Sequence, residues 1–255
     1  MKVIELDASL LNHRELNDRL KECVVGGADR ILLHNVYGQR YIGTRLHSLN
    51  SGKKVEIEIF GTPGNDLGAF LANHRIIVHG NAQDGVGNTM NDGEIIVEGR
   101  AGDVVAMSMR GGKIFIRDGV GYRAAMHMKE DLGKRPVLVI GGSAQDFLGE
   151  YMAGGVVILL GLGNTQHRGN FIGTGMHGGV IYIRGDVDDS QLSKDVGVFE
   201  LEENDKDILT LYVTEFASYF DLGVNFVDIS KEHFLKLLPT TKRPYGQVYA
   251  HRSSQ

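Results

Sequence analysis

Tryptophan is absent from this chain of 255 residues, proline occurs 4 times, and there is 1 cysteine. The lone Cys23 excludes an intramolecular disulfide framework and fits a reducing compartment. A net charge of −5 gives no electrostatic basis for binding nucleic acid or an anionic membrane. No apolar run approaches the roughly 20 residues that cross a bilayer, and the start, MKVIELDASLL, is unlike a secretion signal. These absences predict a cytoplasmic protein with no nucleic-acid partner and no membrane partner.

Glycine is the residue in excess, at 35 positions, about twice its usual share of roughly 7%. Counted along the sequence, 27 of the 35 lie between Ile57 and Gly185. Seven short apolar runs divide the same region at intervals of 19, 19, 19, 23, 20 and 24 residues, starting at Ile57, Ile76, Ile95, Ile114, Val137, Val157 and Ile181. A unit of about nineteen residues, repeated with insertions, is typical of a solenoid whose copies bury their apolar faces against one another.

Chemically similar residues recur at fixed distances from these starts. Four residues after each start stands a turn residue: Gly61, Gly80, Gly99, Asp118, Gly141, Gly161 and Gly185. Further on, a small residue precedes a bulky one by three positions: Gly68 and Leu71, Gly87 and Met90, Ala106 and Met109, Ala125 and Met128, Gly149 and Met152, Gly173 and Met176. If the units stack in register, the bulky residues form one internal ladder, in which flexible methionine fills an irregular corner.

The apolar runs are short, β-branched and bounded by glycine, which indicates strands. A unit of about nineteen residues has no room for a three-turn helix with two loops, so we expect three short strands per coil, stacked about 4.8 Å apart. Since parallel crossovers are overwhelmingly right-handed, the sequence predicts an all-β core, a single-stranded right-handed parallel β-helix with short helical caps at both ends. The residues expected to hold it together are Arg40, Gly43, Gly61, Gly68, Gly80, Gly87, Met90, Gly99, Met109, Met128, Gly149, Met152, Gly173 and Met176.

The segment before the repeats has the pattern of a helix. Asn12 and Glu15 have capping-box spacing, and Gly26 with Gly27 provides a stop signal. Cys23 lies on the apolar face of this helix and is interpreted as a core residue.

The segment after the repeats has two helical patterns. An apolar stripe runs from Ile208 to Phe220 and ends at Gly223, and a second short helix is expected from about Lys231 to Leu238, closed by Pro239. The predicted divisions are therefore 1–43 for the N-terminal helix and leading segment, 44–187 for the β-helix, and 188–255 for the helical C-terminal cap and tail.

Several of the coils, in order, resemble a known family. The segment NVYGQRYIGT, with Asn35, Arg40 and Gly43, resembles the opening motif of the C-terminal β-helix domain of the glutamate synthase large subunit, the GXGXG domain. Successive coils of that domain are similar to IFGTPGNDLGAF, HGNAQDGVGNTMNDGEIIV, GEYMAGGVVILLG and GTGMHGGVIYIRG. The resemblance covers roughly residues 31–187, and FLKLLPTTKRPY is faintly similar to the closing segment of the domain.

The resemblance implies a role as well as a fold. In glutamate synthases this domain is a non-catalytic element that connects the glutamine amidotransferase domain, which releases ammonia, to the FMN-containing domain, which uses it with 2-oxoglutarate to make glutamate. The present chain is too short to hold those domains and resembles the stand-alone subunit form. The implied partners are a glutamine amidotransferase subunit and an FMN-containing glutamate synthase subunit, with FMN and iron–sulfur on the partners, no cofactor on this chain, and a homo-oligomer left open. Subunits of N-methylglutamate synthase and formylmethanofuran dehydrogenase complexes are similar, and they are the alternatives.

Residues that suggest other chemistry have structural interpretations. Gly85-Val86-Gly87 looks like part of a dinucleotide loop, but no helix follows it, which favours a corner turn. Three histidines could converge on a metal across stacked coils, although surface or corner positions are favoured: His127, His167 and His177. Three aspartates at nearly equivalent corners could bind a cation or act as acid and base, but Asx-type bonding to the local backbone is favoured: Asp84, Asp103 and Asp146.

Two functions from different classes remain open. The first is a scaffold subunit of a glutamate synthase-type oxidoreductase, in which partners contact the insertions Lys129–Pro136 and Gly163–Phe171 or the end formed by Asn35–Gly43. The second is an independent enzyme that uses a groove along the β-helix. The absence of tryptophan and the low aromatic content, 7%, disfavour the second, because carbohydrate grooves need aromatic platforms.

Overall fold

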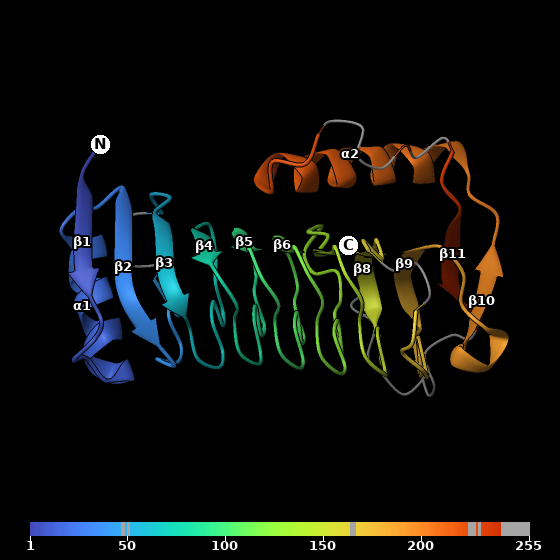
Figure 1. The fold of residues 1–255 in the computed structure, drawn as a ribbon, viewed down its shortest axis with the longest axis horizontal. Helices are drawn as coiled ribbons and strands as arrows, with labels where there is room; N and C mark the ends of the chain where they lie inside the picture. The colour runs from blue at the N-terminus through green and yellow to red at the C-terminus, as the bar shows by residue number, and fades with distance from the viewer. Residues whose placement is uncertain (47–48, 50–51, 164–166, 224–227, 229–230, 241–255) are drawn as a thin grey trace, which may run out of the picture.

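The computed structural model describes residues 1–46, 49, 52–163, 167–223, 228 and 231–240. In these residues eleven strands form one long sheet in the order β1-β2-β3-β4-β5-β6-β7-β8-β9-β11-β10 (Figure 1). The strands are β1 (Val3–Asp7), β2 (Arg30–Tyr37), β3 (Glu56–Thr62), β4 (Arg75–His79), β5 (Glu94–Val97), β6 (Lys113–Ile116), β7 (Val137–Ile140), β8 (Ala153–Leu159), β9 (Gly178–Arg184), β10 (Val196–Phe199) and β11 (Phe234–Pro239). The helices are α1 (His13–Val25), the short 3-10 helix η1 (Asp189–Gln191) and α2 (Glu203–Tyr219). Neighbours from β1 to β9 are parallel, whereas β11 pairs antiparallel with both β9 and β10.

The register of the sheet confirms the repeat read from the sequence. One column of paired, fully buried residues runs across seven strands: Ile57, Ile76, Ile95, Ile114, Leu138, Val157 and Ile181. The sequence prediction is off by one residue in the fifth repeat, because Leu138, not Val137, continues this column. The turn glycine of that repeat is accordingly Gly142, whose N–H donates to the carbonyl of Asp118 at 2.7 Å.

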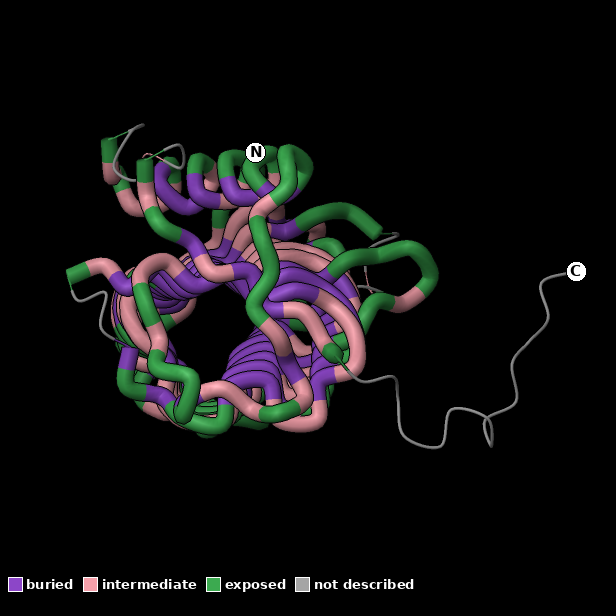
Figure 2. Tube along the Cα trace, turned by 90° about the vertical axis from the view of Figure 1, so that its right-hand side faces the viewer, coloured by how far each residue is buried: buried purple, intermediate pink, exposed green. Residues whose placement is uncertain are grey.

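The predicted right-handed parallel β-helix with three short strands per coil is wrong. The described part of the chain forms a single, mostly parallel eleven-stranded sheet, to which each repeat contributes one strand. The remainder of each repeat is made of reverse turns, because alternate residues there have a left-handed backbone that a strand cannot adopt; φ is +69° at Gly87 and +53° at Thr89. Seen along the long axis, the turns of successive repeats overlie one another, and buried residues line their inner side (Figure 2).

An apolar core lies between one face of the sheet and the turns. It includes the column of strand residues and the predicted internal ladder, in which Leu71 is 1% exposed and Met90, Met109, Met128, Met152 and Met176 are all 0% exposed. Leu16, Leu20 and Val24 of α1 join the same cluster. The capping box of α1 is formed as predicted, with Asn12 Oδ1 accepting from the N–H of Glu15 at 3.1 Å and Glu15 Oε2 accepting from the N–H of Asn12 at 3.0 Å.

The C-terminal elements do not form the helical cap that the sequence predicts. Helix α2 lies along the outer face of the sheet (Figure 1), where Leu209, Val213 and Phe216 share a second apolar cluster with residues of β5 to β9. The helix expected over Lys231–Leu238 is wrong, because Phe234–Pro239 is strand β11. Backbone pairing on both sides of β11 outweighs the local helical pattern of FLKLL.

A buried polar network holds α2 to the sheet. Asp205 of α2, 5% exposed, accepts hydrogen bonds from the Tyr182 hydroxyl at 2.6 Å and from Lys236 Nζ at 2.7 Å. Burial alone would raise the pKa of Asp205, but these two donors outweigh burial and lower it. The network thus joins α2, β9 and β11 in one place.

Charged residues alternate across the outer face of strands β2 to β6, the last two of which also contact α2. Paired positions on five neighbouring strands carry opposite signs in turn: Arg30, Glu56, Arg75, Glu94 and Lys113. Arg75 Nε lies 2.7 Å from Glu94 Oε2, and Lys113 also pairs with Glu215 of α2. Opposite charges on adjacent strands stabilise the register of the sheet. The divisions predicted at residues 43 and 187 remain a prediction; the sheet itself runs through β1 and β2 to β10 and β11.

Candidate partner-binding surface

The turns of seven repeats share one backbone pattern, in which three alternate residues are left-handed. We call the middle one the inner position and its two neighbours, two residues before and two after, the flanking positions. The inner positions have φ between +58° and +85°, and they are Gly43, Gly68, Gly87, Ala106, Ala125, Gly149 and Gly173. At Gly87 a Cβ atom would collide with Cδ1 of the buried Ile114. The inner position therefore faces the core and admits only small side chains.

Hydrogen bonds between repeats stabilise this unusual backbone. The N–H of inner Ala125 donates to the carbonyl of Val105 in the preceding repeat at 2.8 Å. The N–H groups of flanking Arg123 and His127 donate to the backbone carbonyls of Asp146 and Glu150 of the following repeat, each at 2.9 Å. The left-handed residues are thus held from both sides by their neighbours in the stack. Because left-handed conformations of non-glycine residues are strained, these bonds make the turns dependent on stacking.

The three aspartates that the sequence places at equivalent corners also form hydrogen bonds between neighbouring repeats. Oδ1 of Asp84 accepts from the N–H of Asp103, and Oδ1 of Asp103 accepts from the N–H of Tyr122, each at 2.9 Å. Asp146 Oδ1 accepts from the N–H of Asn170 at 2.8 Å. Each carboxylate therefore bonds to the following repeat, so the interpretation of these residues as local Asx turns is wrong.

The remaining residues predicted to be structural lie in or beside the turns. Gly61 has φ +132°, and a Cβ atom there would collide with the carbonyl of Val36; Gly80 and Gly99 occupy the same column in the next two repeats. Arg40 is exposed, and its carbonyl accepts from Asn17 Nδ2 of α1 at 2.9 Å. Its guanidinium has no ion pair among the residues that the structure describes.

The flanking positions carry exposed aromatic residues in both halves of the stack, and in the N-terminal half Tyr41 is 44% exposed and Phe70 is 41% exposed. Phe171 is 53% exposed and Tyr151 is 47% exposed, and neighbouring Tyr122 is 48% exposed. We call the group of Tyr122, Arg123, His127, Phe147, Tyr151 and Phe171 the aromatic surface. Sequence reasoning missed it, although the signal was present: Phe147 and Phe171 both lie two residues before an inner glycine.

Rings in the aromatic surface stack along the repeats. Phe147 and Phe171 have ring centroids 4.9 Å apart, and His127 and Tyr151 have centroids 5.3 Å apart. Arg123 lies over Phe147, with Cζ 4.8 Å from the ring centroid, and its Nη1 lies 2.5 Å from Oε2 of Glu150. These side chains are therefore ordered on a fixed backbone before any partner binds, which lowers the entropic cost of binding.

The histidines that could converge on a metal have separate partners. His127 stacks on Tyr151, His167 Nε2 lies 2.8 Å from the carbonyl of Arg184, and His177 Nδ1 lies 3.0 Å from the carbonyl of Gly175. In the described part of the chain no group of three or more His, Cys, Asp or Glu residues is arranged to hold a metal ion. Cys23 packs, partly buried, on the core, and burial raises the pKa of its thiol. None of the helices in the described part of the chain has the length and apolarity needed to cross a membrane.

One titratable cluster lies on the open outer face. The imidazole of His79 bonds through Nε2 to Glu58 at 3.1 Å and through Nδ1 to Glu98 at 3.0 Å, and the ring stacks on Phe60. Burial disfavours the charged ring, but the two carboxylates outweigh burial and raise the pKa of His79.

Comparison with known proteins connects the turn pattern to a family. A model of the GXGXG motif family matches residues 20–240. The chain belongs to the GXGXG motif family. Alternate glycines such as Gly85 with Gly87 and Gly173 with Gly175 occupy the left-handed positions of the turns, which gives the motif of this family a structural meaning.

Two similar proteins extend over nearly the whole chain of this GXGXG family member. It is 48% identical over 257 residues to the uncharacterized protein MJ1350 of Methanocaldococcus jannaschii, covering 98% of this chain and 97% of that protein. Among solved structures, a chain of the formyltransferase/hydrolase complex FhcABCD of Methylorubrum extorquens, in complex with methylofuran, is similar with a TM-score of 0.58. That similarity covers 92% of this chain and 94% of the other at 16% identity, and it shows a shared fold.

Proposed function

We propose that this chain is a non-catalytic scaffold subunit of a multi-subunit enzyme complex, and that partner subunits dock on its aromatic surface. The observation that carries the proposal is the aromatic surface itself, because solvent-exposed Phe, Tyr and Arg side chains held on a rigid frame are typical of interface hot spots. Glu150 beneath Arg123 is 7% exposed, so the surface also has a fixed charged anchor. Exposed apolar side chains that are grouped together are typical of interaction sites.

Two kinds of complex are supported by different observations. The structural neighbour belongs to a formyltransferase/hydrolase complex, which supports a one-carbon complex of the formylmethanofuran dehydrogenase type, and we place this first. The sequence motifs resemble the glutamate synthase domain, which supports a complex with a glutamine amidotransferase subunit and an FMN-containing synthase subunit. In either complex, the cofactors would be held by the partners.

Purification of the tagged chain from its native cells tests the proposal. Identification of the bound chains by mass spectrometry distinguishes the two complexes, and recovery of the chain without bound subunits would contradict the scaffold function.

A double variant tests the docking surface. In Phe147→Asn with Phe171→Asn, asparagine keeps the left-handed backbone, since it tolerates that conformation better than most residues. We expect the melting temperature to change little and the partners to be lost from the purification. Leu211→Gln is the matched control, because Leu211 is an exposed apolar residue of α2, 59% exposed, away from the turns. Partner recovery that is equal in all three proteins would reject this surface.

A further inference from the structure

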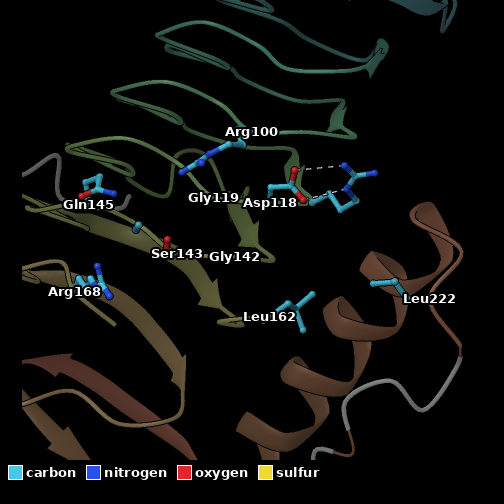
Figure 3. Close-up of a pocket in the computed structure, with 11 residues that line it drawn as sticks. Arg100, Asp118, Gly119, Gly142, Ser143, Gln145, Leu162, Arg168 and Leu222 are labelled. Atoms are coloured by element: carbon cyan, nitrogen blue, oxygen red, sulfur yellow. Dashed lines mark hydrogen bonds and ion pairs between the residues drawn. The ribbon is translucent and has the colours of Figure 1, made fainter. Parts of the chain in front are cut away.

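A pocket of about 730 Å³ opens beside the end of α2, and none of its lining residues belongs to the aromatic surface. Its wall is formed by the segments that follow β5, β6, β7 and β8, together with Arg168 and Leu222 (Figure 3). This volume lies in the range of sites that bind small organic molecules.

The pocket exists because glycine interrupts a column of side chains. Arg100, Gly119 and Ser143 occupy equivalent positions in three successive repeats, since the N–H of Ala101 donates to Gly119 O at 3.1 Å and the N–H of Val120 donates to Ser143 O at 2.8 Å. A Cβ atom on Gly119 would lie 2.8 Å from the carbonyl oxygen of Ser143. The floor between Arg100 and Ser143 is therefore bare backbone.

The lining is positively charged, although the chain as a whole carries a net charge of −5. Three arginines and one carboxylate line the pocket: Arg100, Arg117, Arg168 and Asp118. Asp118 is paired with Arg117, with Oδ1 at 3.1 Å from Nε. Arg100 and Arg168 have no ion pair with any described carboxylate. The pocket thus has two guanidinium groups available to a ligand.

The two ends of the pocket differ in character. In Figure 3, Ser143, Gln145 and Arg168 lie toward one side of the pocket, whereas Leu162 and Leu222 lie toward the other. Guanidinium groups bind carboxylates through paired N–H donors. The leucines favour a ligand with a carbon skeleton.

We propose that this pocket binds an organic polycarboxylate, whose separate carboxylates bond to Arg100 and Arg168. Inorganic phosphate fits less well, because it would use neither two separated arginines nor the apolar end. Helix α2 ends at Tyr219, so it presents its C-terminal end to this region. That end carries a partial negative charge of about 0.5, which is smaller than the charge of the two free arginines. The inference goes beyond the scaffold function and does not depend on it.

Isothermal titration calorimetry of the purified chain tests the pocket with three probes: citrate, a tetraglutamate peptide and inorganic phosphate. We expect citrate or the peptide to bind, and the double variant Arg100→Gln with Arg168→Gln to weaken binding at least tenfold. The control Arg14→Gln with Arg19→Gln removes the same charge from exposed positions of α1, and binding should be unchanged. Melting curves of both double variants check that the fold is intact.

The probes also distinguish the source of the ligand. Citrate binding supports a free small molecule, and binding of the peptide alone supports an acidic segment of a partner. Three results would overturn the proposal: binding of neither carboxylate probe, equal affinity in the Arg100 and Arg168 variant, or phosphate bound as tightly as the carboxylates.

Discussion

The buried network of Asp205, Tyr182 and Lys236 gives a quantitative prediction. In Asp205→Asn the carboxylate is lost while the ammonium of Lys236, in a residue 7% exposed, stays in the protein. Removal of one partner of a buried ion pair costs about 3–5 kcal/mol, because the other charge remains desolvated. Glu202 Oε1 lies 4.0 Å from Lys236 Nζ and offsets part of this loss, so we expect the lower end, about 3 kcal/mol.

Urea denaturation of a small set of variants measures this cost. Tyr182→Phe removes one hydrogen bond and should cost about 1 kcal/mol. Asp205→Asn combined with Lys236→Met removes both charges, and the double variant should recover most of the loss seen in Asp205→Asn. A cost below about 1 kcal/mol for Asp205→Asn, or a double variant less stable than the single one, would refute the reasoning that this pair is buried and coupled.

Two further predictions concern the core and the open face of the sheet. Met109→Asp places an unpaired charge in a core position that is 0% exposed, so the variant should not melt cooperatively. The control Met109→Leu should still melt cooperatively. A soluble Met109→Asp variant with a normal melting curve would show that Met109 lies outside the core. Since the pKa of His79 is raised in the folded state, its contribution to stability is complete below the unfolded pKa of about 6.5 and is lost as pH rises through the folded value. Between pH 6 and pH 8 the free energy of unfolding should therefore decrease more in the wild type than in His79→Gln. Parallel pH profiles of the two proteins would exclude a contribution of His79 to stability.

The sequence correctly predicted the period of the repeat, but it did not predict the left-handed backbone conformation of the turns. The period is visible because each repeat places a buried β-branched residue in the same column, as Ile76, Ile95 and Ile114 do. The turns are hidden because their left-handed positions are only partly glycine. Val104, Arg123 and Phe147 adopt the same conformation, and nothing in their residue type predicts it; only bonds to neighbouring repeats stabilise it.

The sequence contains the alternating charges of the sheet, but it does not determine where α2 packs or that β11 is a strand. Alternating charges such as Glu56, Arg75 and Glu94 follow the period, and they could have been read from the sequence with the apolar column. The place of α2 on the outer face could not, because its apolar stripe fits any apolar surface. The predicted helix at Lys231–Leu238 failed for a related reason: two neighbouring strands decide the conformation of FLKLL.

We propose that this chain works as part of a larger assembly. Size-exclusion chromatography of a native cell extract, with immunodetection of the chain, tests it most directly, because the free chain has a mass of 27.9 kDa. We predict elution in a complex of several times that mass, and a shift to smaller size when Phe147 and Phe171 are replaced by asparagine. Elution of the native chain at the position of a free 27.9 kDa protein would contradict the scaffold function.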